Sequence, residues 1–373
     1  MTITIVGGGL AGATVATELR DSGYTEPIAL FASEAHFPYE RPPLSKGFLL
    51  GEKPLSSAYV HEPDWYAANN VDLHLTTPVV EIRPTDHVLE TANGTQPFGQ
   101  LVLATGASPR PLPMADHSGK EVVYLRTMDD SMKLKDRLAN KPKVAIIGAG
   151  WIGLEVAAAA RAADCEVTVF ESAAKPLIGV LGPEIAQVFE DLHRAHGVDL
   201  RLDHETTQAD LEDADLVVVG IGAIPATKLA KEAGLDIDNG VLVDAQLRTS
   251  HPDIYAIGDI ANHDHPVLKR RIRVEHWDTA IEQAKVAAHN LLGKDEPYER
   301  FPYFFTDQYD LGMEYVGSVG PEGYDDLIIE GDLADKFRAY WLRQGKVVAA
   351  MHVNDWDATE VLRASIGNSP SAI

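Results

Sequence analysis

Six glycines stand in two groups with the same spacing, which is typical of loops that hold a dinucleotide. The groups are Gly7, Gly9 and Gly12, and Gly148, Gly150 and Gly153. In such a G-x-G-x-x-G loop the first glycine allows a tight turn, the second lets backbone approach a pyrophosphate, and the third lets a helix pack on a strand. The free N–H groups at the start of that helix then bind phosphate. The spacing therefore predicts two dinucleotide sites.

An acidic residue follows each glycine group by about 20 residues, as a site for an adenosine ribose requires. These residues are Glu34 and Glu171, and each would accept hydrogen bonds from ribose hydroxyls. For one glycine group alone, a glycine-rich turn that binds nothing remains a serious alternative. Two complete copies in one chain favour two bound dinucleotides.

Glu171 also indicates which nicotinamide cofactor is used. A carboxylate at this position would repel the 2′-phosphate of NADPH, and no arginine occurs in the segment ESAAKP that begins at Glu171. Lys175 is the one nearby cation that argues the other way. We expect NADH rather than NADPH.

The elements around each glycine group have the order strand, helix, strand. In the first copy Thr2 to Val6 is apolar, a helical pattern ends near Gly23, and Ile28 to Phe31 is the next apolar run. In the second copy Lys143 to Ile147 and Val167 to Phe170 enclose an alanine-rich helical segment. Repeated βαβ units of this kind form parallel sheets. The predicted fold class is α/β with two Rossmann-like domains.

The composition excludes several classes of protein. A chain of 373 residues is long enough for two or three domains, and 45% hydrophobic with 24% charged residues is ordinary for a globular protein. Lys and Arg number 32 against 56 Asp and Glu, so the formal net charge of −24 opposes binding to nucleic acid or anionic lipid. The first residues do not resemble a secretory signal, and no apolar run has the length of a membrane span. We expect a cytoplasmic enzyme.

Cys165 is the only cysteine, which excludes an internal disulfide, a redox-active CxxC pair and a cysteine zinc site. Electron chemistry in this chain therefore needs a cofactor. The 14 histidines form no recognisable catalytic set, and we name no nucleophile. The segment Asn262 to His265 alternates histidine and aspartate before Pro266, and we interpret it as a polar loop rather than a metal site. No metal is predicted.

Several longer segments resemble one known family. They are PYERPPLSKGF (Pro38 to Phe48), VLATGASPRP (Val102 to Pro111), GAGWIGLEVA (Gly148 to Ala157), IYAIGD (Ile254 to Asp259), VEHWDTAIEQA (Val274 to Ala284) and PYFFTDQYD (Pro302 to Asp310). The chain resembles the oxygenase-coupled, NADH-dependent ferredoxin reductases of the putidaredoxin reductase kind. These are flavoproteins of the glutathione-reductase fold and are related to apoptosis-inducing factor.

The resemblance implies a division into three domains. FAD would be bound by a discontinuous domain of residues 1–112 and 243–302, and NADH by an inserted domain of residues 113–242. Residues 303–373 would form a small α+β domain that covers the flavin. In this family the N-terminal glycine group holds FAD and the internal one holds NADH.

The resemblance also assigns binding residues. At the end of an apolar strand Asp259 is suited to bind a ribityl hydroxyl, and a predicted helix after Trp277 would direct its N-terminus at the flavin, where negative charge develops on reduction. The implied FAD residues are Gly7, Gly9, Gly12, Ser33, Glu34, Arg41, Lys46, Val80, Ala104, Arg110, Asp259, Glu275, His276, Trp277 and Phe305. The implied NADH residues are Gly148, Gly150, Ile152, Gly153, Glu171 and Gly222.

Lys46 and Glu155 are the residues that we expect to act nearest the reaction. The resemblance implies that they pair beside the flavin ring, near N5; two unrelated surface charges are the alternative. Hydride passes from C4 of the nicotinamide to N5 of the flavin when these two atoms are held about 3 to 3.5 Å apart, and the transfer needs no acid or base. The pair would therefore position the nicotinamide and would not move a proton.

Two departures from related flavoproteins affect the path of the electrons. Disulfide reductases of this fold carry a cysteine pair after the FAD ribose acid, and this segment, EAHFPYERPPLSKGF, has none. Electrons must leave the flavin directly, which suits a one-electron partner. The second departure is Phe305, where the family usually has tryptophan. Phenylalanine can still stack, but it has no indole to take part in electron passage.

The partner implied by the resemblance is a [2Fe-2S] ferredoxin that serves a P450 or a ring-hydroxylating dioxygenase. Such ferredoxins are usually acidic, so docking needs a local positive patch. Lys269, Arg270, Arg271 and Arg273 supply one before the predicted flavin edge, and Lys336, Arg338, Arg343 and Lys346 could extend it; a solvated loop is the alternative. An NADH oxidase or quinone reductase, and a redox-sensing flavoprotein, remain alternative functions, as do monomer and homodimer.

Overall fold

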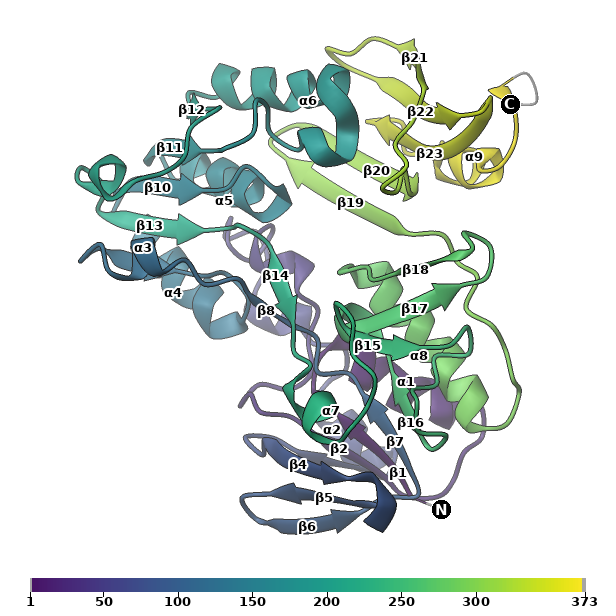
Figure 1. The fold of residues 1–373 in the computed structure, drawn as a ribbon. Coiled ribbons are helices and arrows are strands. Elements are labelled where there is room, and N and C mark those ends of the chain that lie inside the picture. The colour runs from purple at the N-terminus through teal and green to yellow at the C-terminus, as the bar shows by residue number, and fades with distance from the viewer. Residues whose placement is uncertain (1, 371–373) are drawn as a thin grey trace. The chain divides into compact units, whose positions relative to one another are not determined.

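The computed structural model describes residues 2–370, and the chain divides into two compact units (Figure 1). Unit 1 contains Met1–Arg41, Leu55–Ser108 and Ile224–Arg300. Unit 2 contains Pro42–Pro54, Pro109–Ala223 and Phe301–Ile373. The three-domain division stays a prediction; its boundary between residues 242 and 243 lies inside a strand, Val241–Val243.

The main sheet of unit 1 is parallel and has the order β16-β7-β1-β2-β3. Its strands are β1 (Ile3–Val6), β2 (Ile28–Phe31), β3 (Val71–His74), β7 (Gln100–Leu103) and β16 (Ile254–Ala256). β1 and β2 are buried at every residue, as strands are when helices cover both faces of a parallel sheet. This places the first glycine group at the carboxyl end of a central strand.

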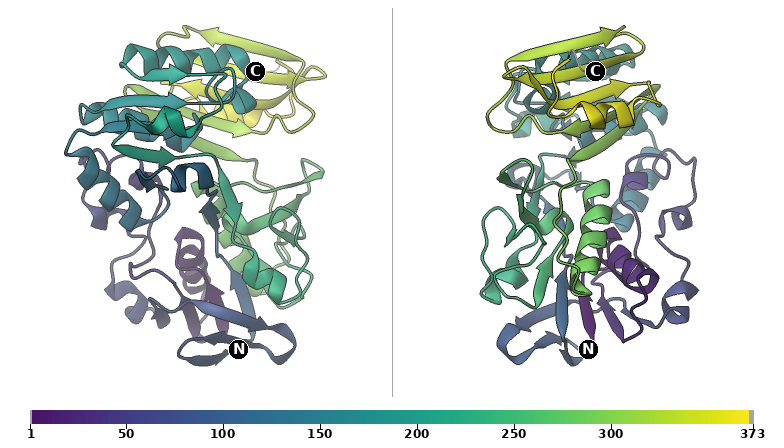
Figure 2. Two further views of the ribbon diagram at one scale, coloured as in Figure 1. Left: turned by 60° about the vertical axis from the view of Figure 1, so that its left-hand side comes forward. Right: turned by 90° about the vertical axis from the view of Figure 1, so that its right-hand side faces the viewer.

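Two helices of unit 1 pack against each other, α1 (Leu10–Asp21) and α8 (Trp277–Leu291). They run side by side in the right-hand view of Figure 2, where α1 is purple and α8 is green. Both helices bury small residues, among them Ala13 and Ala16 of α1 and Ala284 and Ala287 of α8. The helix predicted after Trp277 is confirmed.

The rest of unit 1 is built from short elements. Its two short helices are α2 (Asp64–Ala68) and α7 (Lys228–Glu232). One further sheet consists of β4 (Val79–Arg83), β5 (Val88–Thr91) and β6 (Gly94–Pro97). Another consists of β15 (Val241–Val243), β17 (Ala261–His265) and β18 (Arg270–Ile272). A pair of strands, β8 (Ala107–Pro109) and β14 (Ala223–Pro225), contains two of the points where the chain passes from one unit to the other.

The parallel sheet of unit 2 repeats the first architecture, with the order β12-β11-β10-β13-β9. Its strands are β9 (Glu121–Val123), β10 (Lys143–Ile147), β11 (Glu166–Phe170), β12 (Asp199–Arg201) and β13 (Leu216–Val219). The accompanying helices are α3 (Pro113–Asp116), α4 (Met128–Leu138), α5 (Trp151–Ala162) and α6 (Ile178–Ala195).

The C-terminal part of unit 2 is an antiparallel sheet with one helix, α9 (Thr359–Ser365). The strand order is β19-β20-β23-β22-β21, with β19 (Tyr303–Gln308), β20 (Leu311–Gly317), β21 (Asp326–Gly331), β22 (Phe337–Arg343) and β23 (Lys346–Val353). It packs against the kinked α6, where the N–H of buried Trp341 donates to the carbonyl oxygen of Leu181 at 3.2 Å. The predicted fold class is confirmed, with two Rossmann-like sheets and a small α+β part.

None of the helices in residues 2–370 combines the length and the apolar character that a membrane crossing requires.

Candidate functional site

The first glycine group forms a tight loop between β1 and α1. Gly7 has φ +124°, and a Cβ atom there would lie 2.1 Å from the carbonyl oxygen of Ala104. A Cβ on Gly12 would lie 2.1 Å from the carbonyl oxygen of Gly7, so only glycine lets α1 approach β1 this closely. Gly9 is the N-cap of α1 and has open space around its missing side chain.

The second glycine group has the same geometry between β10 and α5. Gly148 has φ +100°, and a Cβ on Gly153 would lie 2.1 Å from the carbonyl oxygen of Gly148. Gly150 is the N-cap of α5. In both loops the N-cap residue has no side chain to satisfy the first N–H groups of the helix, and neither helix has an acidic residue in its first turn. Both loops therefore fit a pyrophosphate, whose oxygens would accept from these N–H groups.

The two predicted ribose acids are held in place in different ways. Glu34 accepts from the hydroxyl of Tyr39 at 2.6 Å and forms an ion pair with Arg41 at 3.2 Å. Glu171 accepts from two backbone N–H groups, that of Ala149 in the glycine loop at 2.7 Å and that of Ala173 at 2.8 Å. Each carboxylate keeps lone pairs for ribose hydroxyls.

Lys175, the cation that could have favoured NADPH, is engaged elsewhere in unit 2. Its ammonium group forms an ion pair with Glu190 at 3.2 Å and also donates to Gln187. The charge at the predicted adenosine ribose is therefore that of Glu171.

Lys46 and Glu155 form the pair that the resemblance implied. Lys46 lies in the loop Pro42–Pro54 and Glu155 in the second turn of α5, and Nζ lies 2.6 Å from Oε1. Glu155 is only 4% exposed, which excludes the alternative of two unrelated surface charges. Its carboxylate also accepts from Ser45 at 2.5 Å and from Thr306 of β19 at 2.6 Å.

Three donors on one buried carboxylate hold it in a fixed orientation, since charge-assisted hydrogen bonds are stronger and shorter than neutral ones. The sequence analysis did not identify Ser45 or Thr306, although each is the neighbour of a predicted residue. Phe305 lies beside the pair: the Lys46 ammonium is 5.2 Å from the centre of its ring, close enough for a cation–π contact.

The loop that carries Lys46 is anchored on α4. The hydroxyl of buried Ser131 donates to the carbonyl oxygen of Leu44 at 2.6 Å, and Lys135 donates to that of Phe48 at 2.8 Å. Lys135 also lies over the Phe48 ring. These contacts hold the backbone on both sides of Lys46.

The predicted flavin-edge residues of unit 1 lie around the start of α8. Asp259 is in a single 3-10 turn, Gly258–Ile260, after β16, and Arg273 donates to its carbonyl oxygen at 2.9 Å. His276 caps α8: its ring nitrogen accepts from the N–H of Asp278 at 3.2 Å. Trp277 is the first residue of the helix, and Glu275 lies just before the cap and is exposed.

The remaining predicted residues are spread over both units. Ser33 follows β2, Val80 is an exposed residue of β4, and Ala104 follows β7. In unit 2 the N–H of Arg110 donates to the carbonyl oxygen of Gly222 at 2.9 Å, and Ile152 is exposed in the first turn of α5. The binding roles of these residues stay predictions.

The prediction of a polar loop at Asn262 to His265 is wrong. These residues belong to β17, which pairs with β15 and β18, and Asn262, His263 and His265 are buried. Burial lowers the pKa of His263 to about 3, so its imidazole is neutral. Pairing with a strand on each side, β15 and β18, overrides the weak strand preference of Asn, His and Asp.

Several cations of the predicted positive patch also form contacts within the protein. Arg273 forms an ion pair with Glu275 at 2.5 Å, and Arg271 donates to the carbonyl oxygens of Val243 and Asn262 at 2.9 and 3.0 Å. In the C-terminal sheet Lys336 and Arg338 share the carboxylate of Asp355, and Arg343 forms an ion pair with Glu322.

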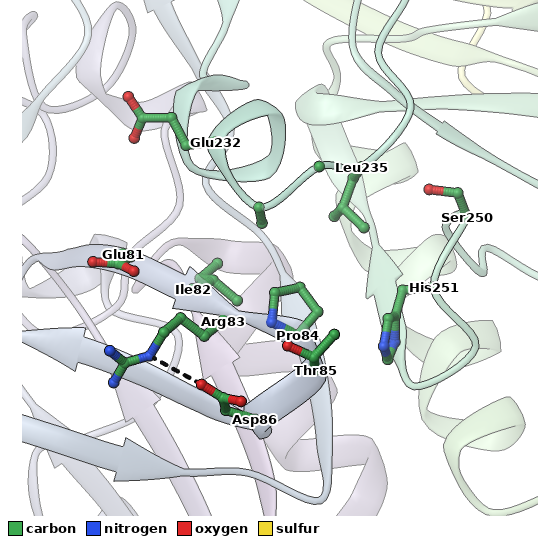
Figure 3. A pocket seen from close by; sticks show the side chains of 12 residues that line it. Glu81, Ile82, Arg83, Pro84, Thr85, Asp86, Glu232, Leu235, Ser250 and His251 are labelled. Carbon is green, nitrogen blue, oxygen red and sulfur yellow. Dashed lines mark ion pairs between the residues drawn. The ribbon is translucent and has the colours of Figure 1, made fainter.

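A cavity of about 440 Å³ lies elsewhere in unit 1 and is lined by none of the predicted residues (Figure 3). Arg83, Asp86, Glu232 and His251 are among its lining residues. His251 also belongs to the one group of possible metal ligands found within residues 2–370, with His87 and Asp253. Since Nδ1 of His251 already accepts from the N–H of Asp253 at 3.3 Å, we assign no metal there.

Comparison with known proteins agrees with this geometry. Residues 1–284 match the family model described as pyridine nucleotide-disulphide oxidoreductase, and residues 303–372 match the model described as reductase C-terminal. Putidaredoxin reductase CamA of Pseudomonas putida is 40% identical, over 94% of this chain and 88% of that protein. The ferredoxin–NAD(+) reductase component of the anthranilate 1,2-dioxygenase system of Burkholderia cepacia is 38% identical, over 94% and 90%.

A solved structure is similar over the whole chain. The crystal structure of the covalent putidaredoxin reductase–putidaredoxin complex matches with a TM-score of 0.93 and 36% identity, covering 100% of this chain and 95% of that chain. The protein belongs to the pyridine nucleotide-disulphide oxidoreductase family and is an oxidoreductase, and the predicted family resemblance is confirmed. FAD and NADH are the cofactors of such enzymes, in agreement with the two glycine loops.

Proposed function

We propose that this protein is an NADH:ferredoxin reductase that serves an oxygenase, either a P450 or a ring-hydroxylating dioxygenase, in the cytoplasm. The observation that carries the proposal is the pair of equivalent glycine loops in a chain whose single cysteine, Cys165, is buried. Two dinucleotides can be held, and no cysteine pair is present to pass electrons on. When bound, FAD would supply the redox chemistry, since a flavin can accept a hydride from NADH and release electrons one at a time.

The residues of unit 1 would hold FAD. The N–H groups at the start of α1 would bind its pyrophosphate, Glu34 its ribose, and Asp259 a ribityl hydroxyl. The start of α8 would favour negative charge on the flavin ring, since a helix N-terminus contributes about 0.3 to 2 kcal/mol toward an anion. His276 keeps that helix end ordered by capping it.

The residues of unit 2 would hold NADH, with the N–H groups of α5 on its pyrophosphate and Glu171 on its ribose. Lys46 and Glu155 would form one wall of the reaction site. Their pairing, the anchors of the Lys46 loop on α4 and the ring of Phe305 give this wall little freedom. A fixed wall supports the proposed positioning role, because most of the acceleration of hydride transfer comes from orientation.

The partner is proposed from the missing cysteine relay and from the relatives, several of which are named as ferredoxin reductases. We place its docking surface near Lys269 and Arg270. Lys269 and Arg271 are exposed, and Arg271 also donates to carbonyl groups while Arg273 is paired with Glu275.

The test uses the purified holoenzyme under nitrogen. We expect a yellow protein whose flavin is bleached by NADH much faster than by NADPH. In air, cytochrome c reduction by NADH should depend on added [2Fe-2S] ferredoxin. The genomic neighbours of the gene offer a second test, since a ferredoxin or oxygenase gene is expected there.

Other outcomes would support the alternatives. Rapid turnover with oxygen or a quinone alone would mean an NADH oxidase or quinone reductase. Slow bleaching followed by a long-lived charge-transfer complex and dimerisation would mean a redox-sensing flavoprotein. A colourless protein that takes up no FAD would overturn all three.

A further inference from the structure

A chain of buried side chains extends from the Lys46–Glu155 pair into the interior of unit 2. Thr306 donates to Glu155 at 2.6 Å, the amide nitrogen of Gln308 donates to the Thr306 hydroxyl at 3.1 Å, and Nε2 of His193 lies 2.8 Å from the amide oxygen of Gln308. Thr306, Gln308 and His193 are at most 1% exposed. Moving one side chain of such a series would leave a buried donor or acceptor without its partner, which costs free energy. Each side chain of the series therefore restricts the orientation of the next.

Three different elements bring these side chains together. Thr306 and Gln308 are two residues apart on β19 and therefore point to the same face of the strand. His193 comes from the last turn of α6, and Glu155 from α5. Because β19 is distant in sequence from α5 and α6, no local sequence motif predicts the series.

The hydrogen bonds of the series can run in one direction only. An ionised carboxylate accepts hydrogen bonds and donates none, so the Thr306 hydroxyl must donate to Glu155. The Thr306 oxygen then accepts from the amide nitrogen of Gln308, which turns the amide oxygen toward His193. That oxygen can only accept, so His193 must carry its proton on Nε2.

The state of His193 agrees with this direction. Burial lowers the pKa of His193 to about 4, so the imidazole is neutral at physiological pH and has one N–H group. With that proton on Nε2, Nδ1 is a lone-pair nitrogen, and within residues 2–370 it has no hydrogen-bond partner. A second proton on Nδ1 would be a buried donor without an acceptor, which would destabilise the folded protein.

We propose that Thr306, Gln308 and His193 are positioning residues that hold the Glu155 carboxylate, and through it the Lys46 ammonium, in the arrangement needed for hydride transfer. This inference rests on the proposed function. Thr306 acts on Glu155 directly, and Gln308 and His193 act only through Thr306. An amide is a poor proton carrier, so the series fixes an orientation and does not conduct protons.

The kinetic experiment measures anaerobic flavin bleaching at saturating NADH in a stopped-flow instrument. Thr306→Val keeps the side-chain shape but removes the hydroxyl, and we expect the rate constant to fall about tenfold, because a buried anion loses one of three donors. Thr306→Ser restores the hydroxyl and should react nearly as fast as the wild type. Thr4→Val, which removes a fully buried hydroxyl in β1 of unit 1, is the matched control and should leave the rate unchanged.

The double variant distinguishes action through Thr306 from a general loss of packing. Gln308→Leu should slow bleaching roughly three- to tenfold, although Gln308 does not touch Glu155. Thr306→Val/Gln308→Leu should be no slower than Thr306→Val alone, because the effect of Gln308 needs the Thr306 hydroxyl. FAD content and thermal unfolding of every variant identify any that fails to fold.

A readout that is independent of activity is the His193 side chain in the ¹⁵N-histidine NMR spectrum of the oxidised holoenzyme. We expect a slowly exchanging proton on Nε2 and an unprotonated Nδ1 in the wild type and in Thr306→Val. In Gln308→Leu the Nε2 proton should lose its acceptor and exchange faster.

Three results would overturn the inference: a Gln308→Leu enzyme as fast as the wild type, additive slowing in the double variant, or a His193 that is protonated on Nδ1. They are separable from failure of the proposed function. If NADH does not bleach the wild type, the proposed function is wrong; if NADH bleaches the wild type and all variants react like Thr4→Val, only the positioning series is wrong.

Discussion

At the scale of single residues, the Glu171 carboxylate combines a structural and a selective role. Backbone N–H groups of Ala149 and Ala173 hold it at the glycine loop, so it cannot turn away from a ligand there. Lys175, the cation that could offset its charge, is paired with Glu190. We therefore attribute the proposed preference for NADH to the negative charge of Glu171.

Replacing this charge tests the preference. Glu171→Gln should raise kcat/KM for NADPH about tenfold relative to that for NADH, because the 2′-phosphate no longer meets a like charge. Steady-state kinetics with both nucleotides measure the ratio. Glu166→Gln, an exposed substitution at the start of β11, is the control. An unchanged NADPH-to-NADH ratio in Glu171→Gln would show that selection arises elsewhere.

Other residues show how far sequence reasoning reached at this scale. Glu34 and Glu171 could be predicted because the motif fixes their distance from the glycines. The Lys46–Glu155 pair came only from the family resemblance, since 108 intervening residues separate the two in the chain. Thr306 and Gln308 were missed because alternation along a strand tells which residues share a face but not which helix they meet.

At the scale of elements, the two loops between strand and helix contain glycines with different tasks. A Cβ on Gly12 would collide with backbone at 2.1 Å, so this glycine serves the packing of α1 on β1. Gly9 has φ −93° and nothing within 4 Å of a built Cβ, so an alanine fits there in the polypeptide itself. The space beside Gly9 is where we propose the FAD pyrophosphate.

Alanine at the two positions should therefore have opposite consequences. Gly9→Ala should leave the thermal unfolding of FAD-free protein unchanged and weaken FAD binding at least about tenfold, because the methyl group occupies the phosphate space. Gly12→Ala should lower the unfolding temperature even without FAD, because α1 must move. Calorimetry and fluorescence titration with FAD measure both. Normal FAD affinity in Gly9→Ala would place the pyrophosphate somewhere else.

Elements were predicted best where local pattern and tertiary structure agree. The βαβ units and α8 follow from apolar runs and helical periodicity, which the parallel sheets and the α1–α8 contact reinforce. β17 was missed because Asn262 to His265 are polar and precede a proline, and their burial is decided by β15 and β18. Pairing between separate segments has no signature within a four-residue window.

At the scale of the whole molecule, the net charge of −24 opposes the acidic ferredoxin that we propose as partner. Charges farther from the contact than the Debye length, about 8 Å at physiological salt, are largely screened, so the local charge at the docking surface decides. The candidate surface is centred on exposed Lys269 and its neighbour Arg270. Arg273 is paired with Glu275, and Arg271 binds carbonyl groups. Reversing Arg271 or Arg273 would disturb the fold as well as the surface.

The charge test should therefore spare those two arginines. Lys269→Glu/Arg270→Glu should raise KM for a [2Fe-2S] ferredoxin several-fold in the ferredoxin-dependent cytochrome c assay, while NADH-dependent ferricyanide reduction stays unchanged. Lys228→Glu/Lys231→Glu reverses two exposed charges on α7 and alters the net charge equally, so it separates local from global electrostatics. Raising the salt concentration should shrink the difference between wild type and the first variant, since screening weakens the attraction that the substitution removes. Equal KM values for the two double variants would mean that ferredoxin responds to the field of the whole protein or docks on another face.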